Sequence, residues 1–461
     1  MADLLNRIST FADNFFLMDK TKELGEGSIP RLMLKYFIPA FIGVFVNALY
    51  NIVDRIFIGQ GVSAVALSAV SVIFPVMLIM MAFGMLIGIG AGVLVSINMG
   101  RRDMDKAERV LGNSFLLMIL ASGLITLIGF VIKMPMLKMF GATPETIEYA
   151  NDYLNIILLG TVFQVVGFSL NNVIRSEGNA RIAMYSMILS AGLNMILDPL
   201  FIFVFDLGVK GAAYATVISM IALSVWVLLH FRSSRSIVKL RPKYFRLEIP
   251  IVKEILAIGM APFFMQTANS AVQALINTKL IRFGGDLAVG AMGIINSVIT
   301  LIVMSIVAIN MATQPIIGFN YGANEGSRVK ETLRLAMISA TVISLVAFVL
   351  VQAFPEAIVG LFNSSDPELL AIGKQGLRLA MLALPLVGFQ VVVGNFFQSV
   401  GRAQIATLLT LLRQVIVLIP LLYILPDFLD LKGIWISMPI ADTCSALIVT
   451  YFISKEWKRL A

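Results

Sequence analysis

Cysteine, histidine and charged residues are scarce in this chain. Among its 461 residues, one is cysteine (Cys444), one is histidine (His230), and 13% are charged. A single cysteine excludes an internal disulfide. A lone histidine lacks the positioned partners that acid–base catalysis requires. We therefore expect no enzyme activity, and a membrane-embedded protease or acyltransferase is excluded because it would need a histidine, cysteine or metal constellation.

Long apolar segments dominate what is present. Apolar residues make up 59% of the chain, and only 13% of its residues are charged. A soluble domain carries roughly 25% charged residues. Stretches of about 20 apolar residues or more recur, long enough to cross the bilayer as helices, and the alternation of a membrane barrel is absent. The sequence predicts an all-α membrane protein with twelve transmembrane helices, at approximately 33–58, 64–97, 107–131, 144–173, 181–205, 211–231, 251–283, 287–318, 329–352, 368–400, 405–425 and 433–456.

The net charge of +8 reflects membrane topology. Basic residues gather in the N-terminal arm, in alternate loops such as 232–246, and at the C-terminus. The positive-inside rule then places both termini in the cytoplasm, so we expect no nucleic-acid partner. No cleavable signal peptide is visible, and the start of the chain is either an interfacial amphipathic helix or a disordered arm. We expect a multi-pass, monomeric protein of a prokaryotic plasma membrane.

An internal duplication divides the predicted helices into two sets of six. Similar residues recur at an offset of 222–223, including Pro39 with Pro262 and Asn98-Met99-Gly100 with Asn320-Tyr321-Gly322. Because six is even, both repeats enter from the same face, which makes them parallel repeats around a central cavity. The expected domains are an N-terminal arm (1–32), an N-lobe (33–231), a linker (232–250), a C-lobe (251–456) and a tail (457–461).

Two acids interrupt apolar segments of the first repeat. Asp54 lies in YNIVDRIFIG and Asp198 in LNMILDPLFIF, although an ionised side chain at bilayer depth costs at least about 2.5 kcal/mol. Asp54 aligns with Asn277 in the second repeat, and Asp198 aligns near 419–421, where no acid occurs. Fold maintenance alone would affect both repeats alike, so the asymmetry favours a functional role.

Polar side chains on two further helices match the predicted depth of the acids. At about 1.5 Å per residue, the acids lie roughly 7–11 Å below the outer boundary. The site is completed by Tyr153, Asn194 and Thr216, and it can hold either a proton shared between the carboxyl groups or a sodium ion at Asp54, Asn194, Asp198 and Thr216. The alternative is a polar network that only fixes helix packing.

Two features elsewhere in the helices leave alternatives open. Pro39 and Gly43 precede Asp54 on the first helix, where proline permits either a hinge or a static kink. In the second repeat, Arg413 and Asp442 form either a buried ion pair, since intramembrane charges usually pair, or a second proton site at Asp442.

The chain resembles the multidrug and toxic compound extrusion (MATE) family over nearly its whole length, and it looks most similar to bacterial MepA-type and DinF-like members. The resemblance rests on IPAFIGVFVNALYNIVDRIFIG, RSEGNA, AGLNMILDPLFIF and GVKGAAYAT. It implies a V-shaped, two-lobe antiporter that expels amphipathic, often cationic compounds in exchange for Na⁺ or H⁺, with no other cofactor.

The resemblance also assigns roles to residues. It implies that Asp54, Tyr153, Asn194, Asp198 and Thr216 form the cation site, that Pro39 and Gly43 form the bend of the first helix, and that Asn171, Tyr50 and Asn277 are candidates for the substrate cavity. The acidic C-lobe site of some members has no counterpart here. The competing function is a lipid or oligosaccharide-lipid flippase, which would favour a cavity rich in cations; the helix interiors offer only Arg55, Lys279 and Arg413.

Overall fold

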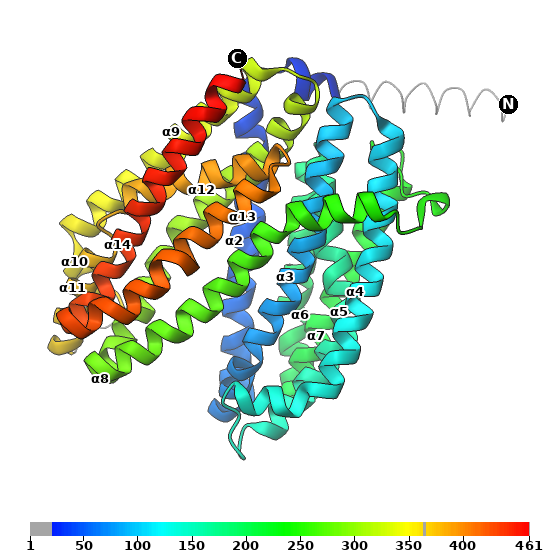
Figure 1. The fold of residues 1–461 in the computed structure, drawn as a ribbon. Coiled ribbons are helices and arrows are strands. Elements are labelled where there is room, and N and C mark those ends of the chain that lie inside the picture. Colours follow the sequence, from blue (N-terminus) through cyan, green and yellow to red (C-terminus); the bar gives the residue numbers. More distant parts are fainter. Residues whose placement is uncertain (1–20, 363–365, 461) are drawn as a thin grey trace. The chain divides into compact units, whose positions relative to one another are not determined.

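The computed structural model describes residues 21–362 and 366–460. Most of the predicted N-terminal arm, including its candidate amphipathic helix, lies outside these residues. The described chain is almost entirely helical (Figure 1). Its elements are α2 (Ile29–Gly61), α3 (Ala64–Gly100), α4 (Met104–Met139), α5 (Ile147–Ser176), α6 (Ala180–Pro199), η1 (Leu200–Val204), α7 (Gly208–Arg232), η2 (Pro242–Tyr244), α8 (Ile249–Gly322), α9 (Gly326–Ala353), α10 (Pro355–Gly360), α11 (Pro367–Ala380), α12 (Leu384–Ser399), α13 (Ala403–Leu411), η3 (Leu412–Leu418) and α14 (Ile419–Arg459).

The twelve predicted spans can be traced onto these helices. Within the described residues, nine helical segments are long and apolar enough to cross a membrane, or ten when the bent pair α11–α12 counts as one span. Two of the ten contain a backbone break and each holds two predicted spans: α8 breaks at Gly285 and α14 breaks at Asp430. The prediction of an all-α, twelve-helix membrane fold is confirmed.

The duplication is visible in the backbone. Left-handed residues, which are uncommon outside glycine, recur in the two repeats at nearly constant spacing: Arg102 with Asn324, 222 residues apart, and Gly178 with Gly401, 223 residues apart. At Gly178 the amide donates to Arg175 O at 3.0 Å, and at Gly401 it donates to Gln398 O at 3.0 Å. Both repeats therefore end the corresponding helix with the same turn.

By its contacts the chain separates into two units. One comprises Met1–Phe263 with Gly318–Asn324, and the other comprises Phe264–Ile317 with Glu325–Ala461. Each has its own apolar core, built around Tyr153 in the first and Trp435 in the second. In the first unit, α3 packs on α4 and α5, α5 on α7, and α2 on α6 (Figure 1). The limits predicted for the lobes stay a prediction.

The basic segment after α7 is fixed to the start of α4 by ionic contacts. Glu108 Oε2 lies 2.7 Å from Arg241 Nε, and Asp105 accepts a hydrogen bond from the Tyr244 hydroxyl. Glu248 pairs with Arg109, and its own backbone amide donates to Asn113 Oδ1 at 2.6 Å. The linker is thus part of the first unit rather than a free tether.

Acid should weaken this attachment. Hydrogen bonding from Arg109, aided by Arg246, lowers the pKa of Glu248 to about 2, below the roughly 4.3 of an unfolded glutamate. A depressed acid stabilises the fold above its unfolded pKa, and that stability is lost as the pH falls towards about 2. We expect Glu248→Gln to flatten the decline of the apparent Tm between pH 5 and pH 2.5, as measured in detergent. A decline identical to that of the wild type would contradict this assignment.

Candidate functional site

The two acids of the first repeat come together in the structure. Asp54 lies on α2, and Asp198 lies in the last turn of α6, just before Pro199 and the π-helix η1. Asp198 is fully buried and Asp54 is half-buried. The two carboxyl groups lie close enough to interact electrostatically. Residues 144 positions apart therefore form a single acidic pair, as the depth argument predicted.

Asn194 belongs to the same cluster. Its amide Nδ2 donates to Asp198 Oδ1 at 3.2 Å, one helical turn away on α6. Three buried oxygens have no hydrogen-bond partner among the described residues: Asp54 Oδ1, Asp198 Oδ2 and Asn194 Oδ1. Buried polar atoms are normally satisfied, so a set of orphaned oxygens around two carboxylates is the kind of arrangement that binds a cation.

Two tyrosines surround the acids. Tyr153 on α5 is fully buried and interacts electrostatically with both carboxyl groups, and Thr216 on α7 lies beside it. Tyr50 lies one turn before Asp54 on α2 and also interacts electrostatically with both acids. Arg55 follows Asp54, but its guanidinium lies 4.9 Å from the Phe74 ring centroid and forms no ion pair with Asp54 within the described chain. Neither acid of the pair therefore has an ion-pair partner within the described chain.

This arrangement suits a proton or a small hard cation. Two carboxylates in contact repel one another when both are ionised, and a proton or metal ion between them removes the repulsion. Carboxylate and amide oxygens are the donors that hard cations prefer. The described residues contain no group of three or more His, Cys, Asp or Glu side chains that could bind a metal, so an ion here would rely on neutral oxygens for the rest of its shell. The role of the five residues stays a prediction.

The candidate hinge residues precede Asp54 on the same helix, α2. Pro39 and Gly43 are both buried on α2. A Cβ at Gly43 would come within 2.9 Å of Met187 Sδ on α6, so glycine lets α2 approach the helix that carries Asp198. Helix α2 continues through Pro39 without a break, and whether it bends there stays a prediction.

The candidate cavity residues have different surroundings. Asn171 is buried, donates to Ala183 O and Ser186 Oγ, and accepts from Arg175. These contacts link α5 to α6 and leave its amide little capacity for a substrate. In the second unit, Asn277 Oδ1 accepts from Gln273 Nε2 at 3.0 Å. Of the three candidates, only Tyr50 lies beside the acidic pair.

The second unit holds a compensated ion pair. Arg413, within the π-helix η3, directs Nε to Asp442 Oδ1 on α14 at 2.5 Å. Gln390 Nε2 donates to the same oxygen at 2.9 Å. Asp442 therefore differs from Asp54 and Asp198, because its charge is balanced by a direct cationic partner.

A double-mutant cycle should reveal this pairing. We expect Arg413→Ala to lower the free energy of unfolding towards the lower end of the 3–5 kcal/mol typical of a broken buried pair, because the arginine side chain is 32% exposed. Arg413→Ala with Asp442→Ala should recover part of the loss, since a lone buried charge is more costly than an absent pair. Thermal unfolding in detergent measures both, and strictly additive losses would contradict the pairing.

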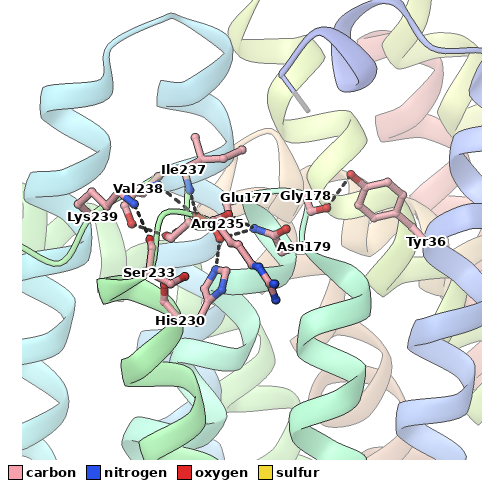
Figure 2. Close-up of polar contacts among 11 residues, drawn as sticks. Tyr36, Glu177, Gly178, Asn179, His230, Ser233, Arg235, Ile237, Val238 and Lys239 are labelled. Atoms are coloured by element: carbon pink, nitrogen blue, oxygen red, sulfur yellow. Dashed lines mark hydrogen bonds and ion pairs between the residues drawn. The ribbon is translucent and has the colours of Figure 1, made fainter. Parts of the chain in front are cut away.

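A second polar cluster surrounds Glu177, at the turn between α5 and α6 (Figure 2). This carboxylate is fully buried, and Oε2 accepts hydrogen bonds from the amides of Ile237 and Val238 at 3.0 and 3.1 Å. It also accepts from Ser236 Oγ, and Oε1 lies 2.5 Å from His230 Nε2. Glu177 thus joins the α5–α6 turn, the end of α7 and the linker.

The same turn holds the base of α2. The Tyr36 hydroxyl donates to Gly178 O at 3.1 Å (Figure 2). Tyr36 lies about one turn before Pro39 on α2. The N-terminal part of α2 is therefore anchored just before the candidate hinge.

Two polar residues were misjudged from the sequence. We expected no positioned partner for His230, but it is buried against Glu177. Arg175 was left out of the cations inside helices, because the helix was expected to end at residue 173; α5 instead extends to Ser176 and buries Arg175. The one available signal was Glu177 in RSEGNA, an acid directly after an apolar span.

Comparisons with known proteins agree with this architecture. The MatE family model matches the chain twice, over residues 39–200 and 262–424. The multidrug export protein MepA of Staphylococcus haemolyticus is 30% identical over 439 residues, which cover 94% of this chain and 95% of that protein. The two family matches begin 223 residues apart, in agreement with the duplication.

Solved structures are similar over the same length. The MATE multidrug transporter DinF-BH, solved as a complex, is 39% identical, with a TM-score of 0.87, and the match covers 94% of this chain and 96% of that chain. A MATE structure in a bent conformation is 27% identical, with a TM-score of 0.90. The match covers 96% of this chain and 98% of that chain.

Proposed function

Since this chain belongs to the MatE (multidrug and toxic compound extrusion) family of membrane transporters, we propose that it exports amphipathic, often cationic compounds in exchange for H⁺ or Na⁺. The proximity of the Asp54 and Asp198 side chains, with Asn194 donating to Asp198, is the observation that supports the coupling. No direct cationic partner balances these acids among the described residues, and three oxygens of the cluster have no hydrogen-bond partner there. The names of the relatives support multidrug export.

Coupling requires that the ion binds two shapes of the protein with different affinity. A proton or sodium ion at the acidic pair removes net negative charge and changes which hydrogen bonds the carboxylates accept. Helix α2 carries Asp54 and is the one helix of the site with an internal proline far from its ends, Pro39. Its bending would narrow the cavity of the first repeat and expel a bound compound outward.

The charge distribution supports an orientation. With both termini and the linker in the cytoplasm, the ends of α2 and α6 that carry Asp54 and Asp198 face the outside. An ion entering from that side reaches the acids after a short path. We propose a location in the cell membrane of a prokaryote.

A flippase for pyrophosphate-linked lipids is less well supported. Such a cavity needs free cations, whereas Lys279 lies 4.8 Å from the Tyr423 ring centroid and Arg413 is paired with Asp442. The buried Arg175 donates to Asn171 and Asn172. Each of these cations already has a partner inside its own unit.

The test is efflux from proteoliposomes under separately imposed gradients. Vesicles loaded with a fluorescent cationic dye should release it when an inward pH gradient or an inward Na⁺ gradient is applied, and the effective gradient identifies the ion. Dye movement that ignores both gradients would refute antiport, while transport of a pyrophosphate-linked lipid without dye efflux would favour the flippase.

Pro39 should matter more than its counterpart in the second repeat. We expect Pro39→Ala to reduce dye efflux several-fold, because a straightened α2 responds less to the state of Asp54. Pro262→Ala serves as the matched control, since it removes the equivalent proline of the repeat that lacks the acidic pair. Equal initial rates of efflux for the two variants would show that bending of α2 at Pro39 does not contribute to transport.

A further inference from the structure

A groove of about 430 Å³ lies between α4 and α5 on the surface of the first unit. Its walls are mainly apolar, and its two hydroxyl groups are turned away to backbone carbonyls: Ser122 Oγ donates to Ile119 O, and Thr126 Oγ1 donates to Leu158 O. It is lined by Ile119, Ser122, Gly123, Thr126, Leu127, Phe130, Leu159 and Val162.

Small residues on α4 create this groove. A Cβ at Gly129 would come within 2.5 Å of Leu158 Cδ2, so glycine brings α4 close to α5. One and a half turns earlier, a Cβ at Gly123 would meet nothing within 4 Å. The helices therefore touch at Gly129 and leave an open hollow beside Gly123, flanked by the exposed side chains of Leu127 and Leu159.

The groove lies on the surface of a candidate membrane span. It extends along α4 from Ile119 to Phe130, about 16 Å at 1.5 Å per residue, within a candidate membrane span. Exposed leucines on either side, Leu120 and Leu124, continue the apolar surface. Packing of a further protein helix would need a contact along a whole helix face, whereas this hollow is narrow and short.

A cation lies at one end of the groove. Lys133 Nζ lies 5.7 Å from the ring centroid of Phe130, a lining residue, and donates to Asn155 Oδ1 at 2.7 Å. Within the described residues Lys133 forms no ion pair. Asp152, which lies one turn before Asn155 on α5, is instead paired with Lys210 at 3.1 Å. Lys133 lies about 9 Å from the end of α4, a depth from which a long side chain reaches the headgroup region.

We propose that this groove binds one phospholipid of net negative charge, with an acyl chain along Gly123 and a headgroup phosphate at Lys133. The apolar walls select the chain, and the uncompensated ammonium selects the headgroup. The site is independent of the acidic pair, since none of its residues belongs to that cluster.

Native mass spectrometry of the purified full-length protein tests the proposal. Phosphatidylglycerol and phosphatidylcholine with identical acyl chains are added at equal concentration, and the retained molecules are counted. We expect the wild type to retain phosphatidylglycerol roughly fivefold better, the effect of about 1 kcal/mol for one lysine near an anionic lipid. Lys133→Gln should abolish this preference, whereas Lys138→Gln, which removes an exposed lysine of the same helix outside the groove, should not.

Filling the groove tests the acyl-chain site separately. Gly123→Leu should reduce retention of both lipids without unfolding the protein, because the new side chain enters open space. Gly293→Leu is the matched control, since Gly293 on α8 also has nothing within 4 Å of an added Cβ but lies outside the groove. Equal retention of the two lipids by the wild type, or unchanged retention in Gly123→Leu, would overturn the proposal.

Discussion

Asp54→Asn and Asp198→Asn should each reduce gradient-driven efflux to background while the protein still inserts and folds. Asparagine keeps the size of the side chain and removes the ionisable group. With one carboxylate left, the pair no longer carries two negative charges in contact, so binding of a cation no longer relieves a repulsion. The variant site then binds the cation with little gain in free energy, and an imposed cation gradient cannot drive efflux.

The measurement is dye efflux from proteoliposomes with matched protein content, with the apparent Tm as the check on folding. Asp206→Asn is the control, because Asp206 is an exposed acid eight residues after Asp198, and asparagine tolerates its left-handed backbone. Normal gradient-driven efflux by both Asp54→Asn and Asp198→Asn would remove the coupling role from these acids.

Much of this site could be predicted because its determinants are local. Asp54 and Asp198 each interrupt an apolar run, and the cost of a buried acid marks them without any knowledge of the fold. Counting residues from the helix ends placed them at the same depth, and the structure brings them close enough to interact electrostatically. The same repeat offset relates left-handed backbone positions in the structure, as Gly178 and Gly401 illustrate.

The Glu177 cluster could not be predicted in the same way. Four of its partners are 53 to 61 residues away, and three of these lie in an irregular segment with no periodicity. Two of the groups are backbone amides, which carry no signature in the sequence. Likewise, hydropathy does not reveal that α8 and α14 each continue past a single non-helical residue, at Gly285 and Asp430.

Glu177→Ala should cause the largest loss of stability among substitutions outside the acidic pair. The change removes the acceptor for the amides of Ile237 and Val238, for Ser236 and for His230, all in a buried setting. A buried donor left without a partner costs about 1–3 kcal/mol, and removing one partner of a buried pair costs about 3–5 kcal/mol. We expect the free energy of unfolding to fall by about 3–5 kcal/mol, since relaxation of the linker offsets part of the sum.

Limited proteolysis distinguishes loss of this anchor from a general loss of stability. The linker contains Lys239, whose backbone amide donates to Glu108 and whose ammonium donates to Ser233 O, so trypsin should cleave there faster once the segment leaves the surface of the first unit. In Glu177→Ala, cleavage there should precede cleavage at other basic loops, such as the one at Arg101. Glu177→Gln keeps one acceptor oxygen and should be intermediate, whereas Glu26→Ala, which removes an exposed partner of Lys22, should match the wild type. If linker cleavage in Glu177→Ala kept the wild-type rate, the carboxylate would not be what holds the linker.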